Sequence, residues 1–148
     1  VMANYIYLLR TSAQNSLKWN ELIKTPSNAK RGKSQITIKA PSEQDTLVFR
    51  SSDFFFAKSD GNYVEFMIVN ENGDISRKII RNTLSNVEEQ FLNYKHILKV
   101  HRSFIVNLQH VKSVKGNAQG YKLTLDSTDF RVPVSRTYVP VLDKAMQQ

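Results

Sequence analysis

The sequence contains no cysteine, which excludes disulfide frameworks, thiolate metal sites, iron–sulfur clusters and cysteine nucleophiles. A chain without cysteine fits a reducing compartment, and we expect a cytoplasmic location. Only five glycines and four prolines occur among the 148 residues, so the chain is neither collagen-like nor of low complexity. It also lacks the run of about 18 apolar residues that a membrane-spanning helix requires.

Motifs for catalysis and cofactor binding are missing as well. The sequence has neither a GxSxG nucleophile elbow nor the GxGxxG and GxxxxGK[ST] loops that hold nucleotides. The segment Asp60-Gly61-Asn62 lacks the later ligands of a calcium loop. We expect strand alternation to keep His96 and His110 apart, so these two and His101 predict no zinc site. We therefore predict a protein that is not an enzyme and has no catalytic residue, metal or cofactor.

What the sequence does have is a surplus of positive charge. Twenty-one Lys and Arg face thirteen Asp and Glu, which gives a net charge of +8 and a sequence pI of about 9.8. Residues 1–35 carry six basic and one acidic side chain, residues 36–94 six and nine, and residues 95–148 nine and three. This balance favours a polyanionic partner such as DNA, RNA or an anionic membrane surface, although composition alone fits a soluble basic protein equally well.

Short alternating or β-branched segments dominate from residue 36 onward and predict nine or ten strands. Asn72-Gly73 is the strongest signal for a two-residue hairpin turn. A short amphipathic helix is predicted over residues 83–92, with Asn82 or Thr83 as its cap, and a closing helix over residues 135–146. The predicted fold class is therefore mostly β, with short antiparallel sheets, one internal helix and a C-terminal helix.

The first 35 residues are predicted to form a separate unit. Apolar residues with loose helical spacing predict a helix that ends at Pro26, and residues 26–34 are polar, small and basic, as in a linker. We expect the cations of this linker to be solvated. The chain is thus divided into a helical arm with a basic linker, residues 1–35, and a domain, residues 36–148.

Polar or basic residues interrupt the apolar strand pattern at three predicted loops, within residues 58–64, 100–107 and 132–136. Arg102 and Arg136 carry forked donors suited to guanine edges or phosphates, and the amide of Asn62 can pair with adenine. Any one of these side chains alone would be an ordinary surface residue. Three such interruptions in a strongly basic chain indicate nucleic-acid binding.

Four short motifs carry a family resemblance. The most specific is His-Arg-Ser-Phe-Ile-Val-Asn at residues 101–107, which is close to the motif HRSyiVN. Gly-Asn-Tyr-Val at 61–64, Arg-Asn-Thr-Leu at 81–84 and Pro-Val-Ser-Arg at 133–136 accompany it in the family's order and spacing. With these motifs, residues 36–142 resemble a LytTR DNA-binding domain, as found in transcriptional regulators of the LytR/AlgR type.

The resemblance implies an elongated array of short antiparallel sheets and a bacterial, response regulator-like protein that binds double-stranded DNA sequence-specifically. Family members insert loop side chains into two successive major grooves, contact the minor groove between them and usually bend the DNA. Carried over to this chain, the resemblance places Asn62 in the first contact loop, His101 and Arg102 in the second, and Arg136 in the third. The first loop is the most variable in the family, and a structural hydrogen-bonding role is the open alternative for His101.

The resemblance also bears on partners and on the arm. It implies paired direct-repeat sites and a homodimer on DNA. No receiver domain precedes residue 36, and the apolar, aromatic start of the arm resembles the cytoplasmic exit of a membrane helix. Some family members carry membrane-spanning helices before the domain, so we expect a membrane-embedded region ahead of this chain, which would be a fragment. The open alternative to DNA reading is a protein-interaction or regulatory module that keeps the fold. An RNA-binding domain is disfavoured because no RNP-like stacking motif occurs.

If the arm is a separate unit, deleting residues 1–30 should leave the rest of the chain folded. Its apolar side chains have no evident partner in the β-rich part of the sequence and could pair with a second chain. Thermal unfolding of the truncated and full chains tests this expectation. A large loss of thermal stability in a truncated monomer would instead place the arm in the core.

Overall fold

The computed structural model describes residues 34–42, 44–126 and 128–147. Of the predicted arm and linker, residues 1–35, all but the last two residues therefore lie outside the described residues. The described part is mostly β, as predicted, with ten strands and two α-helices. The strands are β1 (Gln35–Lys39), β2 (Thr46–Arg50), β3 (Phe54–Asp60), β4 (Tyr63–Val69), β5 (Ile75–Arg81), β6 (Ile97–His101), β7 (Phe104–Asn107), β8 (Val111–Asn117), β9 (Gly120–Leu125) and β10 (Arg131–Ser135). The helices are α3 (Leu84–Gln90) and α4 (Val139–Gln147), and three 3-10 turns are η1 (Ser51–Asp53), η2 (Leu108–His110) and η3 (Arg136–Tyr138).

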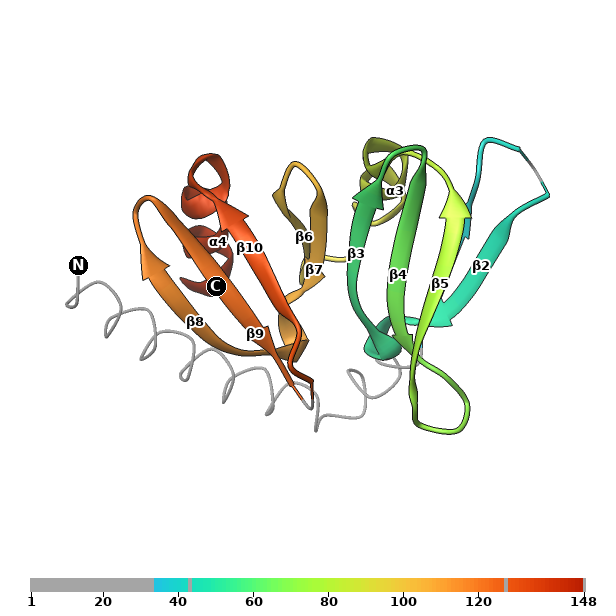
Figure 1. Cartoon of the computed structure of the whole chain (residues 1–148), viewed down its shortest axis with the longest axis horizontal. Helices are drawn as coiled ribbons and strands as arrows, with labels where there is room; N and C mark the ends of the chain where they lie inside the picture. The colour runs from blue at the N-terminus through green and yellow to red at the C-terminus, as the bar shows by residue number, and fades with distance from the viewer. Residues whose placement is uncertain (1–33, 43, 127, 148) are drawn as a thin grey trace.

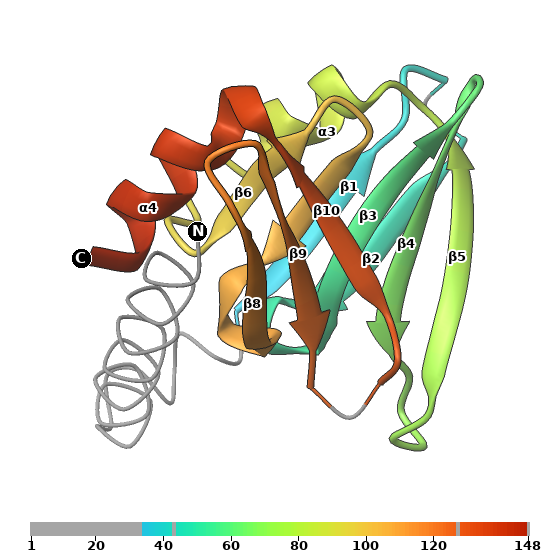
Figure 2. The ribbon, with the colours of Figure 1, turned by 60° about the vertical axis from the view of Figure 1, so that its left-hand side comes forward.

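The strands form three antiparallel sheets placed side by side in an elongated array (Figure 1). A central sheet has the order β5-β4-β3-β7-β6, a three-stranded sheet has the order β10-β9-β8, and β1 pairs with β2. Helix α4 covers one face of the three-stranded sheet and packs against β6 (Figure 2). Within the described ranges, no helix is both long and apolar enough to cross a lipid bilayer.

The first four residues of β3 are buried on both faces of the strand and join two hydrophobic cores. Phe54 and Ala57 belong to the core that the central sheet shares with β1, β2 and α3. Phe55 and Phe56 belong to the core shared with the three-stranded sheet and α4. Two adjacent residues point to the same side because the pairing of β3 with β4 shifts register between Phe54 and Phe56, as in a β-bulge. The two cores therefore meet at one strand.

Asn107, the last residue of β7, holds this region together by hydrogen bonds. Its side chain is fully buried, and its Nδ2 donates to the carbonyl oxygens of Ser51, at 3.1 Å, and Phe54, at 2.9 Å. Its Oδ1 accepts the backbone N–H of Gln109 at 3.0 Å and caps η2. A buried amide with all these partners satisfied orders the start of β3 and the end of β7 together.

One predicted hairpin turn and one predicted helix start differ from the structure. The β4–β5 connection spans residues 70–74, where Asn70 Oδ1 accepts the backbone N–H groups of Asn72 and Asp74, so Asn72-Gly73 is not a two-residue turn. A two-residue turn lies instead at Gly61-Asn62 between β3 and β4. The closing helix begins at Val139 rather than Ser135, because η3 precedes it.

The expectation that His96 and His110 lie apart is wrong. The His96 carbonyl accepts the Leu108 N–H at 2.8 Å, which brings the two histidines close enough to interact electrostatically. His110 contacts the Phe55 ring, with 4.3 Å between ring centroids, and its Nε2 lies 2.6 Å from the Ser52 carbonyl oxygen. The described residues contain no group of three His, Asp or Glu side chains arranged to hold a metal ion.

His96 makes the stability of this region depend on pH. Its Nε2 is buried without a hydrogen-bond partner in the described part of the chain. Burial, and secondarily the nearby His110, lower the pKa of His96 from 6.5 to about 4. The unfolded chain therefore binds a proton below pH 6.5 that the folded chain resists until about pH 4, so stability is lost over this interval as the pH falls.

We expect His96 to lower the free energy of unfolding by up to about 3 kcal/mol as the pH falls from neutrality to about 4. His96→Leu should flatten this dependence in urea unfolding curves measured across that range. Some slope should persist, since burial also lowers the pKa of His110. An unchanged slope in the variant would show that His96 is not the group responsible.

Candidate nucleic-acid interface

The three predicted contact loops lie along one edge of the array. Strands β3, β6 and β10 all end there, at the top of Figure 1. The β3–β4 turn carries Asn62, the β6–β7 turn carries Arg102, and the β10–η3 junction carries Arg136. The side chains of all three are exposed. The structure thus brings the sequence-predicted residues to a common edge, from two different sheets.

The first loop is short and is anchored from below. Gly61 has a φ of +59°, in the left-handed region that glycine adopts without steric cost, and this allows the tight reversal between Asp60 and Tyr63. The Asn62 carbonyl oxygen accepts the backbone N–H of Asn82 at 3.1 Å. The Asn62 side chain is therefore presented by a turn tied to the end of β5.

Asn82 links this turn to α3 and β1. Its side chain is buried, with Oδ1 accepting the N–H of Thr83 at 2.8 Å and Nδ2 of Asn86 at 2.8 Å. Its own Nδ2 donates to the Lys39 carbonyl oxygen at 3.2 Å. Gln90 then holds Lys39 through both backbone groups, at 2.8 and 3.1 Å. This chain of amides fixes the first loop relative to three elements at once.

Thr83, not Asn82, caps α3 in the usual way. Its Oγ1 accepts the backbone N–H of Asn86 at 3.2 Å. Thr83 is therefore the helix cap, whereas Asn82 makes the buried contacts to Lys39 and Asn86. The buried role of Asn82 as an anchor of the contact loop was missed, because the sequence shows only a polar residue before a helix.

The second loop is the two-residue turn Arg102-Ser103. His101 Nδ1 accepts the Ser103 backbone N–H at 3.1 Å, and the His101 ring packs edge-on against Phe104, with centroids 5.6 Å apart. The Ser103 carbonyl oxygen accepts the Ser59 N–H from β3 at 2.9 Å. These contacts support the structural role left open for His101, since its ring shapes the turn from which Arg102 projects.

Acceptance of a hydrogen bond at Nδ1 requires that nitrogen to be unprotonated. Partial burial, and then the neighbouring Arg102 guanidinium, lower the pKa of His101, so the ring is neutral near pH 7.

The third loop is the junction between β10 and η3. Ser135 ends β10 in extended conformation, and Arg136 opens η3 directly after it. Strand β6 packs against η3 and β10, which places the third loop beside the second.

The edge is positively charged, and the sequence-based prediction missed some of its cations. Arg81 is exposed at the end of β5 and is paired in register with Tyr63, whose side chain is 48% exposed next to Asn62. Lys58 lies near the end of β3, with its Nζ 5.9 Å from the Phe104 ring centroid. Among the described residues the one ion pair is Arg77–Glu65, at 3.7 Å, so the edge cations have no carboxylate partner there. Asp60 is the acidic residue at this end of β3.

The molecule is thus a β protein with exposed cations and one exposed amide on three loops along one edge. Such an edge is suited to contact a polyanion. The sequence model of the LytTr DNA-binding domain family matches residues 45–147. The chain therefore belongs to this family. The match covers β2 to α4 and contains all three contact loops.

The chain is similar to curated and solved proteins, among them the following two. The sensory transduction protein LytT of Bacillus subtilis (strain 168) is 21% identical over 126 residues, which are 85% of this chain and 49% of LytT. The chain thus spans about half the length of this curated relative. The solved LytTr DNA-binding domain of a putative methyl-accepting/DNA response regulator from Bacillus cereus has a TM-score of 0.59 and 24% identity, covering 79% of this chain and all of that domain. The latter likeness concerns the fold.

The position of His101 leads to a test of its role. If its ring mainly shapes the turn, His101→Asn should keep DNA binding near the parent level, because an Asn side chain also accepts the N–H two residues ahead. His101→Phe keeps a ring beside Phe104 but loses the acceptor, so it should weaken binding by about tenfold or more. Affinity is measured on a DNA site selected from random sequence, with circular dichroism as the check of folding.

The two variants separate the two roles of His101. Equal, large losses in the Asn and Phe variants would indicate direct contact by the imidazole. Retention in Asn with loss in Phe would indicate positioning. Binding by Phe at the parent level would contradict both roles.

Proposed function

We propose that this chain is the DNA-binding part of a transcription regulator that reads double-stranded DNA sequence-specifically through loop side chains in the major groove. The observation that carries the proposal is the convergence of the ends of β3, β6 and β10 on one edge, with Asn62, Arg102 and Arg136 exposed there. Membership of the LytTr family supports DNA as the polyanion.

The side chains of the three loops suit different contacts. The guanidinium of Arg136 can donate two hydrogen bonds to the O6 and N7 of guanine, and the Asn62 amide can pair with the N6 and N7 of adenine. Arg102 lies in the second loop, where its guanidinium can donate hydrogen bonds to a base edge or to a phosphate. His101 acts as a positioning residue for Arg102 through its bond to Ser103. Arg81 and Lys58 add phosphate contacts on either side of the first loop.

We infer that two copies bind paired direct repeats as a homodimer on DNA. Adjacent strands lie about 4.8 Å apart, so the first and second loops, two strand spacings apart in the central sheet, are separated by about 10 Å. One copy therefore covers a short site, and specificity over a genome needs either DNA bending or a second copy.

Replacing the arginines tests which contacts carry specificity. Arg136→Ala should remove about 1–3 kcal/mol of discrimination at one base position, because a bidentate contact to guanine is lost. Arg102→Ala should show at least part of this pattern. Arg81→Ala should instead weaken all sequences alike and lower the salt slope by about one. Each side chain is exposed, so each variant should fold.

The measurement is binding of each variant to the selected site and to its single-base changes, over a range of salt concentrations. Lys112→Ala is the matched control, since Lys112 is an exposed cation at the start of β8, at the opposite end of the strands. The parent's log affinity should fall with log salt by about 0.9 per neutralised phosphate. Parent-level binding by both Arg102→Ala and Arg136→Ala, or a DNA affinity that does not change with salt, would favour a protein-interaction module instead.

A further inference from the structure

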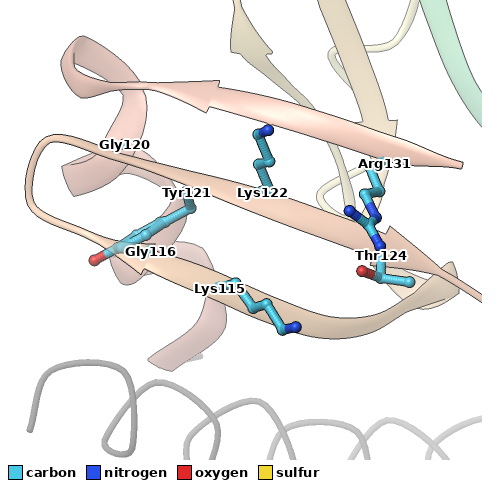
Figure 3. A pocket seen from close by; sticks show the side chains of 7 residues that line it. All are labelled: Lys115, Gly116, Gly120, Tyr121, Lys122, Thr124 and Arg131. Carbon is cyan, nitrogen blue, oxygen red and sulfur yellow. The ribbon is translucent and has the colours of Figure 1, made fainter. Parts of the chain in front are cut away.

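The outer face of the three-stranded sheet, opposite α4, carries a second concentration of positive charge. A hollow of about 400 Å³ lies along this sheet. It is lined by side chains of the outer face and by Tyr121, which packs toward α4 with its hydroxyl 3.5 Å from Asp143 Oδ1. Figure 3 shows that the side chains around it come from all three strands. The lining includes Lys115 and Gly116 from β8, Gly120, Lys122 and Thr124 from β9, and Arg131 from β10.

The register of the sheet places these cations on one side. Lys115 is directly opposite Lys122, and Thr124 is directly opposite Arg131. The intervening residue of β9, Leu123, is fully buried on the other side, toward α4. The solvent face therefore carries Lys115, Lys122, Thr124 and Arg131. Figure 3 shows the Arg131 side chain beside Thr124.

Without a ligand this arrangement is electrostatically unfavourable. Like charges directly opposite each other on antiparallel strands destabilise the pair. No carboxylate lies within ion-pairing distance of Lys115, Lys122 or Arg131 in the part of the chain that the structure describes. Gly120, two residues before Lys122 in β9, brings no side chain to the hollow.

The hollow differs from the proposed reading edge in place and in form. Its cations lie on the face of the sheet, and only its Gly120 end comes near Arg136, because Gly120 pairs in register with Ser135. Arg131 is at the other end of β10, about 13 Å away along a strand that rises about 3.3 Å per residue. A concave site of this volume suits a small ligand better than the convex surface of a duplex.

We propose that this hollow is a binding site for a small anion that carries two or more phosphate groups. Three cations are balanced by three negative charges, more than the roughly −1.5 to −2 that one phosphate group carries near pH 7. Phosphate oxygens accept hydrogen bonds from guanidinium, ammonium and hydroxyl groups together. The bound anion relieves the repulsion between Lys115 and Lys122. This site is independent of the function proposed above, because it makes no use of Asn62, Arg102 or Arg136.

The experiment titrates the full chain with inorganic tripolyphosphate at physiological salt, by calorimetry and by thermal unfolding. We expect saturable one-to-one binding with a rise in Tm. Lys122→Gln and Arg131→Gln should each weaken binding by about tenfold or more. Lys122→Gln should also raise the Tm of the ligand-free chain, because it removes the repulsion with Lys115, a signature that general destabilisation would not give.

The controls locate the site. Lys144→Gln removes an exposed cation of α4, on the other side of the sheet, and should bind as the parent does. A Lys30→Gln, Arg31→Gln double variant lowers the charge of the arm and should also bind normally. Equal losses in all variants, or a loss in the arm variant alone, would overturn the site. Citrate binding as tightly as tripolyphosphate would overturn the assignment to phosphate.

A measurement of DNA binding completes the test. With no tripolyphosphate present, Lys122→Gln and Arg131→Gln should bind the selected DNA site as the parent does. Loss of DNA affinity in these variants together with loss of tripolyphosphate binding would assign the hollow to the DNA interface instead. Failure of the whole chain to bind any DNA would count against the proposed function and leave the anion site standing.

Discussion

The packing of the described residues depends on the first half of strand β3, residues 54–57, being buried on both faces. Its bulge turns Phe55 and Phe56 toward one core while Phe54 and Ala57 face the other. A strand in this position cannot shift without disturbing both cores, because well-packed interiors tolerate little change of volume. Asn107 holds the start of the strand by donating from its buried amide to the carbonyl oxygens of Ser51 and Phe54.

This constraint determines how the edge loops are presented. Strand β3 leads into the first loop, and its neighbour β7 follows directly from the second. The two turns contain two residues each and are tied to the scaffold, through Asn82 in one case and through Ser59 and His101 in the other. Short, anchored loops lose little conformational entropy when a partner binds, which suits them to the contacts proposed for them.

The sequence was informative where short-range rules govern, and less so where tertiary contacts do. Alternation located the strands, and Thr83 could be recognised as a cap because its bond is local. Asn72-Gly73 misled because the Asn70 side chain stabilises a longer loop, an effect that dipeptide statistics do not contain. The proximity of His96 and His110 depends on the pairing of the chain around β7, which no periodicity reveals.

The motif at residues 101–107 illustrates the same limit for the candidate site. Sequence resemblance treats its residues as one signal, but the structure divides them. His101 shapes a turn, Arg102 is exposed, Ile105 and Val106 face different cores, and Asn107 is a buried lock. Only part of the motif is therefore available to a partner. Arg81 and Asn82 show the reverse case, since they form one motif in which the first residue is exposed and the second is buried.

The distribution of charge follows from how the fold is stabilised. One ion pair occurs among the described residues, so the apolar cores and the buried amides, rather than salt bridges, hold this part of the chain together. A net charge of +8 then opposes compaction, and cations left without carboxylates on the edge and on the outer sheet face contribute to that cost. Such an arrangement is stable only because the cores carry the fold. It leaves both surfaces free to gain free energy from an anionic partner, since binding removes a repulsion that folding has left in place.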